Sequence, residues 1–375
     1  MTAPAGLGHA TLYREHTQLA RWRTDWLPAA LVATVTGYAA LARPAGSRLA
    51  DLGVYLGAVD GLRHGRSLYD FASAAGAPFT YPPFAGLLFW PLGFVPLPAL
   101  GTIWTAGTLA TLWWLVHRVA PPAAAPMVAL AVALSAPVSS NLRFGQVSVF
   151  LAALVAADLL VLHGSRAQGV LIGLAAAVKL TPLIFIPMLW LAGQRRSAVT
   201  AAGTFAAATA LGVAVLPADS WRYWTTEIRD VSRLGHITAV GNQSLNGALL
   251  RLGLTAPARS VIVFLVGGAV AAVAVWRAAR LARGGDRLAA LIVTGAASVV
   301  LSPVSWTHHE TWLVLAVLLP VRRDIRAVWI TTVLVIMVLP VTALGPPLWS
   351  NARLLLAVVV AACGSVIDRR SDLLG

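Results

Sequence analysis

Charged residues are scarce in this 375-residue chain, and lysine is almost absent from it. Asp, Glu, Lys and Arg make up 11% of the residues, whereas a soluble domain contains about a quarter. Of the 28 basic residues, only Lys179 is a lysine. The one cysteine, Cys363, rules out an intramolecular disulfide framework, so cysteine usage does not indicate a redox compartment. This composition argues against an ordinary soluble domain.

Apolar residues fill the chain instead. They account for 58% of it, and the mean hydropathy is +0.77. One helical membrane crossing needs about 20 apolar residues, so the length suits about twelve crossings with loops. We therefore predict an all-α, polytopic integral membrane protein. The net charge of +14 could suggest nucleic-acid binding, but the arginines lie in short connections between apolar runs, which is how membrane proteins set their orientation.

The apolar runs predict the membrane-crossing elements. They cover 26–43, 84–118, 124–139, 147–163, 168–178, 183–193, 197–217, 257–280, 287–303, 309–321, 325–344 and 350–367. The second run is too long for one straight span and contains Pro91, Pro96 and Pro98. We expect it to be broken or partly re-entrant, because proline interrupts a helix.

Two consecutive runs, 168–178 and 183–193, are each about half a bilayer long. They meet at Lys179-Leu180-Thr181-Pro182. Non-helical backbone at membrane depth survives only where protein or a water-filled cavity covers it. The junction therefore predicts a cavity beside Lys179.

Arginine placement predicts the orientation. Most arginine clusters fall on one side if both termini are cytoplasmic. The chain then divides into a cytoplasmic tail (1–25), one transmembrane domain (26–367) and a second cytoplasmic tail (368–375). Two long loops, 44–83 and 218–256, face outward. Each contains an amphipathic stretch, 52–62 and 221–234, that we expect to form an interfacial helix.

Unusual polar residues collect on the predicted external side, from distant parts of the sequence. Polar groups at membrane depth are costly and indicate function by default. The set comprises Asp51, Asp60, Tyr81, Asn141, Arg143, Gln146, Lys179, Thr181, Asn242, Gln243, Asn246, Trp306, His308, His309 and Glu310. Acid, cation, imidazole and amide groups together suit a phosphate-bearing substrate with a polar head, delivered from the bilayer.

An ordered set of short motifs carries a resemblance to a known family. Asp51-Leu52-Gly53-Val54-Tyr55 is followed by Tyr81-Pro82-Pro83, Phe144-Gly145-Gln146, Lys179-Leu180-Thr181-Pro182 and Ser302-Pro303-Val304-Ser305-Trp306-Thr307-His308-His309. Over roughly residues 26–345 the chain resembles the actinobacterial polyprenyl-phosphomannose-dependent mannosyltransferases of the GT-C superfamily, which include the enzyme that extends phosphatidylinositol mannosides.

The resemblance implies an inverting transfer of mannose, outside the cytoplasmic membrane, from polyprenyl-phosphate-mannose to a lipid-anchored glycan of the phosphatidylinositol mannoside or lipomannan type. It also implies a catalytic aspartate in the first external loop, which corresponds to Asp51. The acceptor, the linkage and the oligomeric state stay open.

Several candidates also have simpler interpretations. Asp51 could cap the helix that follows it, and Asp60 could form a solvated ion pair with Arg63. Tyr81 could mark the entry to a span. The amides of Asn141, Gln146, Asn242, Gln243 and Asn246 could hydrogen-bond across helices or lie in ordinary polar loops.

Charge on a departing phosphate needs cations nearby. We expect Lys179, Arg143, His308 and His309, with Gln146, to bind the donor without a metal, because no Asp-x-Asp pair occurs at the external site. Arg143 could instead be a snorkelling interfacial residue. Adjacent helical residues point about 100° apart, so one histidine at most faces a given cavity. We place His308 slightly ahead because the resemblance has a histidine just after the Ser-x-Trp-like entry.

Two other classes share this general topology. A secondary transporter also has about a dozen crossings with broken helices, but it would show internal repeats and a site open to both sides. We find no repeat, and the polar set lies on one side. A lipid-linked glycan flippase, polymerase or ligase fits the topology equally well.

Overall fold

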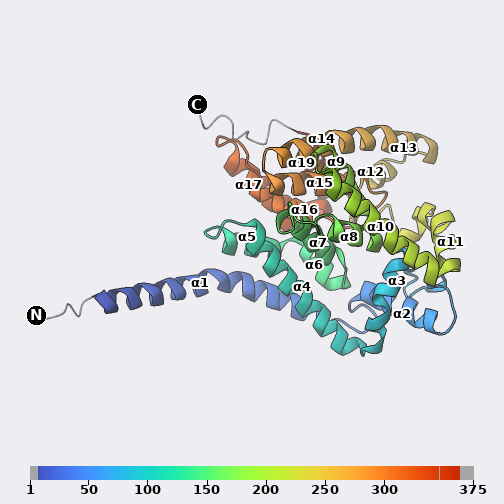
Figure 1. Ribbon diagram of the computed structural model, residues 1–375, viewed down its shortest axis with the longest axis horizontal. Coiled ribbons are helices and arrows are strands. Elements are labelled where there is room, and N and C mark those ends of the chain that lie inside the picture. Colours follow the sequence, from blue (N-terminus) through green and yellow to red (C-terminus); the bar gives the residue numbers. More distant parts are fainter. Residues whose placement is uncertain (1–6, 346, 364–375) are drawn as a thin grey trace, which may run out of the picture.

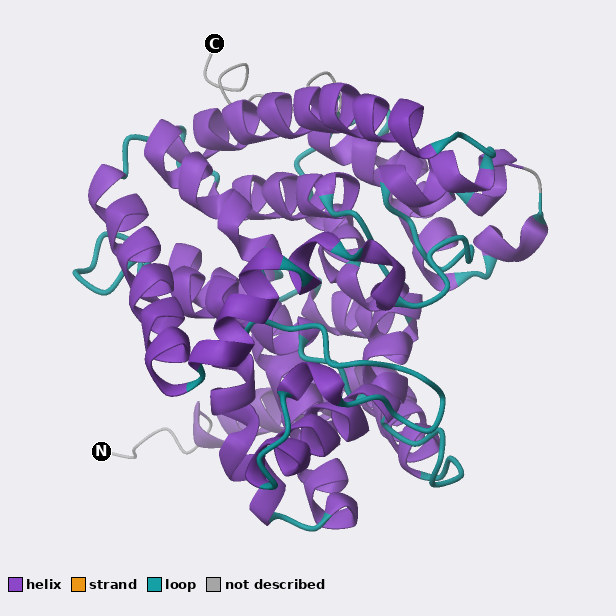
Figure 2. Cartoon of the chain, turned by 90° about the vertical axis from the view of Figure 1, so that its right-hand side faces the viewer, coloured by secondary structure: helices purple, strands orange, loops and turns teal. Residues whose placement is uncertain are grey.

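The computed structural model describes residues 7–345 and 347–363. Within these residues the chain is helical throughout, with no strand and only two isolated β-bridges (Figure 2). The α-helices are α1 (Leu7–Leu41), α2 (Ala50–Arg63), α3 (Pro83–Phe89), α4 (Leu97–Val119), α5 (Ala125–Leu134), α6 (Ala136–Phe144), α7 (Ser148–Leu160), α8 (Val170–Val178), α9 (Phe185–Leu191), α10 (Arg195–Val215), α11 (Pro217–Thr225), α12 (Leu245–Arg251), α13 (Ala256–Ile262), α14 (Gly268–Arg283), α15 (Arg287–Leu301), α16 (Thr311–Val314), α17 (Arg326–Val338), α18 (Pro347–Ser350) and α19 (Ala352–Ala362). The predicted all-α class is confirmed.

Membrane-capable helices are fewer than the apolar runs. Among the described residues, α4, α10 and the continuous helix Ala256–Arg283 are long and apolar enough to cross a bilayer. The pair α5 and α6, bent by 58°, is a fourth if it counts as one span. Most other apolar runs appear as shorter helices that pack together, so length alone does not identify them as crossings.

The predicted breaks are largely confirmed. The long run 84–118 divides into α3, a 3₁₀ turn (Trp90–Phe94) and α4, which starts after Pro96. The two half-length runs become α8 and α9, separated by Lys179, Leu180 and a 3₁₀ turn, η3 (Thr181–Ile184).

Two boundary predictions, for 309–321 and 221–234, differ from the structure. Helix α1 is continuous from Leu7 to Leu41 and packs against α4, α5 and α6, and its N-terminal end extends away from the other helices (Figure 1). The run 309–321 forms only α16 and a 3₁₀ turn, η8 (Leu315–Leu318). The stretch 221–234 is not one helix, since α11 ends at Thr225 and short 3₁₀ turns follow. The predicted tail 368–375 lies outside the described residues.

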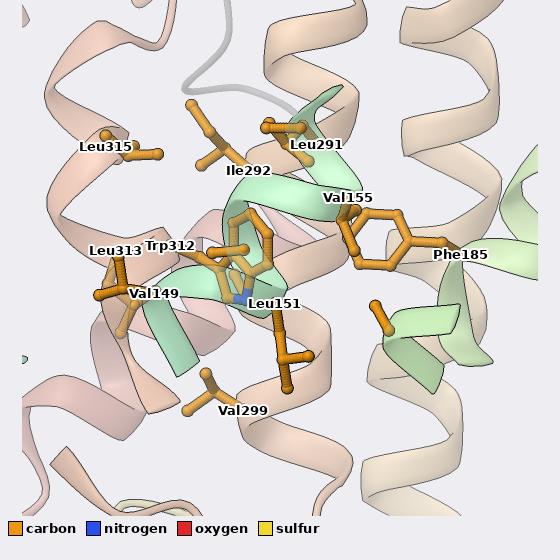
Figure 3. Packing of buried hydrophobic residues seen from close by; sticks show 14 of the residues in the cluster. Val149, Leu151, Val155, Phe185, Leu291, Ile292, Val299, Trp312, Leu313 and Leu315 are labelled. Carbon is orange, nitrogen blue, oxygen red and sulfur yellow. The ribbon is translucent and has the colours of Figure 1, made fainter. Parts of the chain in front are cut away.

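The centre of the core lies between α7, α9, α15 and α16 (Figure 3). The ring of Trp312 in α16 packs against that of Phe185 in α9 at a tilt of 51°, with centroids 5.9 Å apart. Gly295 of α15 makes room for this indole, because a Cβ there would lie 2.4 Å from the Trp312 ring. The helices around the break at Lys179 are therefore closely packed and leave little freedom at its apolar end.

Helix α8 is fixed at its start. The buried carboxylate of Asp158, on α7, accepts hydrogen bonds from the backbone N–H groups of Gly169, Leu171 and Ile172, at 2.8–3.1 Å. Gly169 has a positive φ of 104°, and with Gly173 it lets α8 approach the backbone of α10. Small residues at this spacing are typical of close helix packing in membranes.

The two long loops are joined by polar contacts at the end of the molecule where α2, α3 and α11 gather (Figure 1). Asp219 of α11 accepts hydrogen bonds from Ser67 and from the Leu68 backbone. Arg222 forms an ion pair with Asp70 at 2.5 Å. Its hydrogen bond holds the pKa of Asp70 below the usual value. This contact brings residues from 44–83 and 218–256 together.

Candidate active site

Asp51 lies in the first turn of α2, which the sequence predicted as an amphipathic helix. Leu49 occupies the N-cap position and is buried, with φ of 46°, so the interpretation of Asp51 as the cap is wrong. Leu49 and Leu52 pack against Gly145, where a Cβ would lie 3.1 Å and 2.9 Å from theirs. This packing places the start of α2 beside the turn that carries Gln146.

Gln146 connects Asp51 to two tyrosines. Its amide nitrogen donates to the Asp51 carboxylate. Its amide oxygen lies 3.0 Å from the hydroxyl of Tyr55 and 3.0 Å from that of Tyr81, and it accepts a hydrogen bond from at least one of them. The two hydroxyls lie 2.8 Å apart. All three side chains are buried, so Asp51 has a fixed neutral donor on this side.

Lys179 stands opposite this group, at the end of α8. Its ammonium nitrogen lies 5.3 Å from the centroid of the Tyr81 ring and 2.6 Å from Nε2 of His309. Tyr81 therefore contacts both sides of the site, the Gln146 amide through its hydroxyl and Lys179 through its ring. Three segments far apart in the sequence meet here, as the ordered motifs predicted.

His309, rather than His308, faces Lys179. Both residues lie within a 3₁₀ turn, η7 (Thr307–His309), and their rings are nearly perpendicular. The backbone N–H of Trp306 donates to Nδ1 of His309 at 3.2 Å, which points Nε2 toward Lys179. His308 is buried and its Nδ1 lies 3.4 Å from the hydroxyl of Ser140. The geometry therefore favours His309, against our placing of His308 ahead.

A small pocket with a cavity volume of about 30 Å³ adjoins this basic side. Its polar lining includes Lys179, Thr181 and His309, and its apolar lining includes Phe185 and Trp312. Leu151 and Val299, which belong to the core in Figure 3, also line it. The cavity predicted beside Lys179 is thus present, and both polar and apolar side chains line it.

The electrostatics of Asp51 reflect opposing influences. Burial raises the pKa of its carboxyl above the usual 3.8, whereas the hydrogen bond from Gln146 and the charge of Lys179 both lower it. A carboxylate in such a position accepts a proton more readily than one in water, because desolvation disfavours the charged form. This is the property that a general base needs.

Two charged candidates lie outside the cluster. Asp60 is exposed and its carboxylate lies 3.7 Å from His64, not from Arg63, so the predicted Asp60–Arg63 pair is wrong. Arg63 instead lies over the ring of Phe94 and donates to the carbonyl of Gly93. Arg143 is exposed, with its guanidinium over the Phe144 ring, as a snorkelling residue would be.

Asn242, Gln243 and Asn246 hold a structural junction. The side-chain oxygen of Asn242 accepts from the backbone of Ser305 and from both the backbone and hydroxyl of Ser244. Gln243 donates to two backbone carbonyls and accepts from the Leu354 N–H. Asn246 donates to the Pro303 carbonyl and accepts from Arg259. These amides fasten the second long loop to the turn that leads to His309.

The remaining amide and aromatic candidates are local. Asn141 is buried, and its amide satisfies the Gln146 carbonyl and the Val149 N–H at the junction of α6 and α7. Half-buried Trp306 pairs with Asn242 in an isolated β-bridge. Both therefore support the segments that carry Gln146 and His309, rather than face Asp51.

Sequence reasoning missed Tyr55 and a buried ion pair. Tyr55 was visible one helical turn after Asp51, a spacing that puts both on one helix face. Glu310 and Arg353, both buried, lie 3.5 Å apart, and Arg353 also donates to the Thr307 hydroxyl at 3.3 Å. Arg353 comes from α19, and nothing in its local sequence indicated a partner so distant.

Metal binding is not indicated by clustering of ligands. Across 7–345 and 347–363, no group of three His, Cys, Asp or Glu side chains is arranged to hold an ion. Metal independence stays a prediction.

Residues 79–303 match the family model for glycosyltransferase family 87. The chain belongs to this family. The match includes Gln146 and Lys179, whereas Asp51 and His309 lie on either side of it. The family resemblance that the ordered motifs predicted is therefore confirmed.

Curated relatives come from mycobacteria. A polyprenol-phosphate-mannose-dependent alpha-(1-2)-phosphatidylinositol mannoside mannosyltransferase of Mycolicibacterium smegmatis is 36% identical over 285 residues, which cover 68% of this chain and 64% of the relative. Its namesake in Mycobacterium tuberculosis is 34% identical over 294 residues, or 72% of this chain and 69% of the relative. An alpha-(1-2)-phosphatidylinositol pentamannoside mannosyltransferase of M. smegmatis is 36% identical over 290 residues, with coverage of 72% and 69%. The matches thus span about two thirds of each relative. No solved structure matches the chain significantly.

Proposed function

We propose that this family 87 protein transfers mannose from polyprenyl-phosphate-mannose to a lipid-anchored glycan of the phosphatidylinositol mannoside type. One observation carries the proposal: a half-buried carboxylate, Asp51, lies in one cluster with two converging nitrogen groups, Lys179 and His309. The first side can accept a proton and the second can receive an anion. Mannosyl transfer from a lipid phosphate needs both.

The reaction is a single displacement with inversion. The acceptor hydroxyl gives its proton to Asp51 as its oxygen forms a bond to C1 of mannose. The bond from C1 to the phosphate oxygen breaks, and polyprenyl phosphate leaves with the electron pair. The products are the extended glycan and polyprenyl phosphate, and Asp51 later returns its proton to water. A positioned base typically contributes about 10²–10⁴-fold to such a step.

The basic side receives the leaving group. With Nδ1 of His309 accepting from the Trp306 backbone, Nε2 is the nitrogen that carries the proton in a neutral ring. It then points a donor at the position where Lys179 also points its donors. An anionic oxygen satisfies both at once, so we place the donor phosphate here. The apolar lining of the adjoining pocket, including Phe185 and Trp312, suits the beginning of the lipid chain.

No metal is needed in this mechanism, since Lys179 supplies a cation for the developing charge. We therefore propose a metal-independent enzyme. Dialysis against EDTA should leave the transfer rate unchanged. Loss of activity that Mg²⁺ or Mn²⁺ restores would contradict this part of the proposal.

We further propose a GT-C architecture with about twelve membrane crossings, both termini cytoplasmic and the site facing outward. Asp51, Gln146 and Lys179 cluster near the two long loops, 44–83 and 218–256, which polar contacts join. This supports a single active site on one side of the membrane. Cysteine-accessibility labelling in a Cys363→Ala background tests the orientation. Membrane-impermeant reagent should label a cysteine at 70–75 from outside and leave one at 194–197 unlabelled; the reverse pattern would overturn the orientation.

The central experiment is a transfer assay. Purified protein in liposomes receives radiolabelled polyprenyl-phosphate-mannose and a panel of phosphatidylinositol mannosides, with Asp51→Asn as the inactive control. We expect label in the glycolipid fraction through an alpha-(1-2) linkage, as the names of the relatives suggest. Labelled donor that crosses the bilayer without transfer would instead favour a transporter or flippase.

A further inference from the structure

The amide of Gln146 is held at both ends. Its nitrogen donates to Asp51, and its oxygen faces the hydroxyls of Tyr55 and Tyr81 at 3.0 Å each. The amide is buried, so water does not supply alternative partners. Which end of an amide faces a carboxylate decides whether the contact is attractive or repulsive, since only the nitrogen carries protons.

Counting protons shows that the two tyrosines constrain the amide jointly. Each hydroxyl has one proton, and the hydroxyls lie 2.8 Å apart. Either both donate to the Gln146 oxygen, or one donates to the other and the second donates to Gln146. In both arrangements the amide oxygen receives at least one hydrogen bond. One tyrosine is therefore sufficient, and the loss of both removes every donor from that oxygen.

We propose that Tyr55 and Tyr81 act as an orientation lock, positioning the Gln146 amide so that its NH₂ group always faces Asp51. Neither tyrosine needs to touch the substrate in this role. The effect of this lock on transfer rests on the proposed function, in which Asp51 must be ionised to act as the base. It extends that function to Tyr55, which has no assigned role.

The groups that face Asp51 determine what the lock does. They are Gln146, the ammonium of Lys179, and the phenols of Tyr55 and Tyr81. Burial raises the pKa of Asp51, and the Gln146 hydrogen bond is the largest influence that lowers it. If the amide turns or disorders, the pKa of Asp51 rises further and the fraction of ionised base falls at neutral pH.

The test measures the protonation of Asp51 directly. Dicyclohexylcarbodiimide reacts with protonated carboxyls in apolar surroundings, so its labelling of the Asp51 peptide against pH, followed by mass spectrometry, reports this group without any substrate. The variants are Tyr55→Phe, Tyr81→Phe and the double variant. Tyr223→Phe removes a buried phenol elsewhere in the loops and is the matched control.

We expect each single variant and the control to keep the wild-type labelling midpoint within a few tenths of a unit. The double variant should raise it by about one to two pH units, the size of a hydrogen bond to a charged group. The acid limb of kcat/KM should move by the same amount, with KM for the donor unchanged. A loss of packing alone would lower the yield of folded protein without moving either midpoint.

Two results would overturn the lock: an unchanged midpoint in the double variant, or single variants that each shift it as far as the double. If the double variant does not fold, Tyr55→Phe is combined with Tyr81→Leu, which also removes both hydroxyls, and the same upward shift of the midpoint is expected. Gln146→Leu, which removes the amide itself, should raise the midpoint by the same one to two pH units. An unchanged midpoint in Gln146→Leu would also overturn the lock, as would a further shift when Tyr81→Phe is added to Gln146→Leu. A wild type that labels as expected yet transfers no mannose contradicts the proposed function and leaves the lock standing.

Discussion

Two polar clusters occur in this apolar molecule, and they differ in what their side chains do. Asn242, Gln243 and Asn246 bind mostly backbone groups of the protein itself, and they join the second long loop to the turn before His309. Among the described residues, the Asp51 carboxylate accepts a hydrogen bond from Gln146 alone, and Lys179 faces a single nitrogen of His309 beside a pocket. The first cluster is complete without a ligand, whereas the second retains capacity to bind one.

This difference separates two reasons for a polar residue to exist in a membrane protein. Buried amides that satisfy backbone groups allow irregular chain to exist where water is absent. Ionisable groups beside a cavity do not serve that purpose and are better explained by chemistry. Substitution in the two clusters should therefore have different effects, on stability in the first and on the rate of transfer in the second.

The largest effect should come from Asp51. Asp51→Asn removes the base and should lower the transfer rate by about 10²–10⁴-fold with the protein still folded. Asp60→Asn, on the same helix but exposed, is the matched control and should retain wild-type activity. Radiolabel transfer at saturating donor is the measurement. More than about a tenth of the wild-type rate in Asp51→Asn would remove Asp51 from the role of base.

The pH dependence should follow from the same carboxyl. Because burial raises the pKa of Asp51 above 3.8, the base loses its ionised form at a higher pH than a free aspartate does. We expect kcat/KM to be constant above this raised pKa and to fall as the pH decreases through it. The small residual rate of Asp51→Asn should lack this limb, and a limb that persists there would belong to another group.

Lys179 should follow in size. Lys179→Met removes the cation opposite the leaving phosphate and should lower kcat by about 10²–10³-fold. Arg143→Met removes an exposed cation outside the cluster and should change kcat little. Single-turnover rates with preloaded donor separate chemistry from binding. Equal losses in the two variants would show that general positive charge, rather than the position of Lys179, is what matters.

The two histidines should differ more modestly. His309→Ala removes a hydrogen bond to the phosphate and should reduce transfer about tenfold, the effect of one such bond. His308→Ala should leave the rate per folded molecule almost unchanged while lowering the thermal midpoint, since His308 is buried against Phe144. A stable His308→Ala variant with a strongly reduced transfer rate would show that His308, rather than His309, binds the donor.

The smallest effect on transfer should come from the amide junction. Asn242→Ala leaves the Ser305 N–H and the Ile237 carbonyl without their partner, and should destabilise the protein by about 1–3 kcal/mol. The rate per folded molecule should stay near wild type. Thermal unfolding in detergent measures the loss of stability, and activity measured well below the unfolding midpoint gives the rate per folded molecule. A large fall in rate without destabilisation would place Asn242 in the active site.

Run lengths and amphipathic patterns in the sequence predicted where helices of the site begin, end and break. The half-length runs on either side of Lys179 predicted a broken helix and a cavity, because short helices and exposed backbone have few alternatives in a bilayer. The amphipathic pattern over 52–62 predicted the helix that the structure extends to 50–63. The partner of Asp51 was not predictable as such, since Gln146 is 95 residues away and its amide becomes informative only with Tyr55 and Tyr81 around it.

The histidines show why the rest of the site could not be predicted from the sequence. The rotation of about 100° per residue in an α-helix predicted that at most one of the two histidines faces the cavity. Both lie in a 3₁₀ turn instead, so this rotation did not identify His309 as that residue. Asp60 similarly pairs with His64, four residues later in the sequence. Arg63 instead contacts Phe94, 31 residues away, and donates to the carbonyl of Gly93.

Helix α8 sets the position of Lys179 by its length. It is nine residues long, begins where Asp158 holds its first N–H groups and ends at Lys179. An α-helix turns about 100° and rises 1.5 Å with each residue. One inserted or deleted residue between these points would leave the composition and the packing class of α8 intact, yet turn the chain's only lysine away from Asp51. The number of residues in α8, more than their identity, keeps the two charges facing each other.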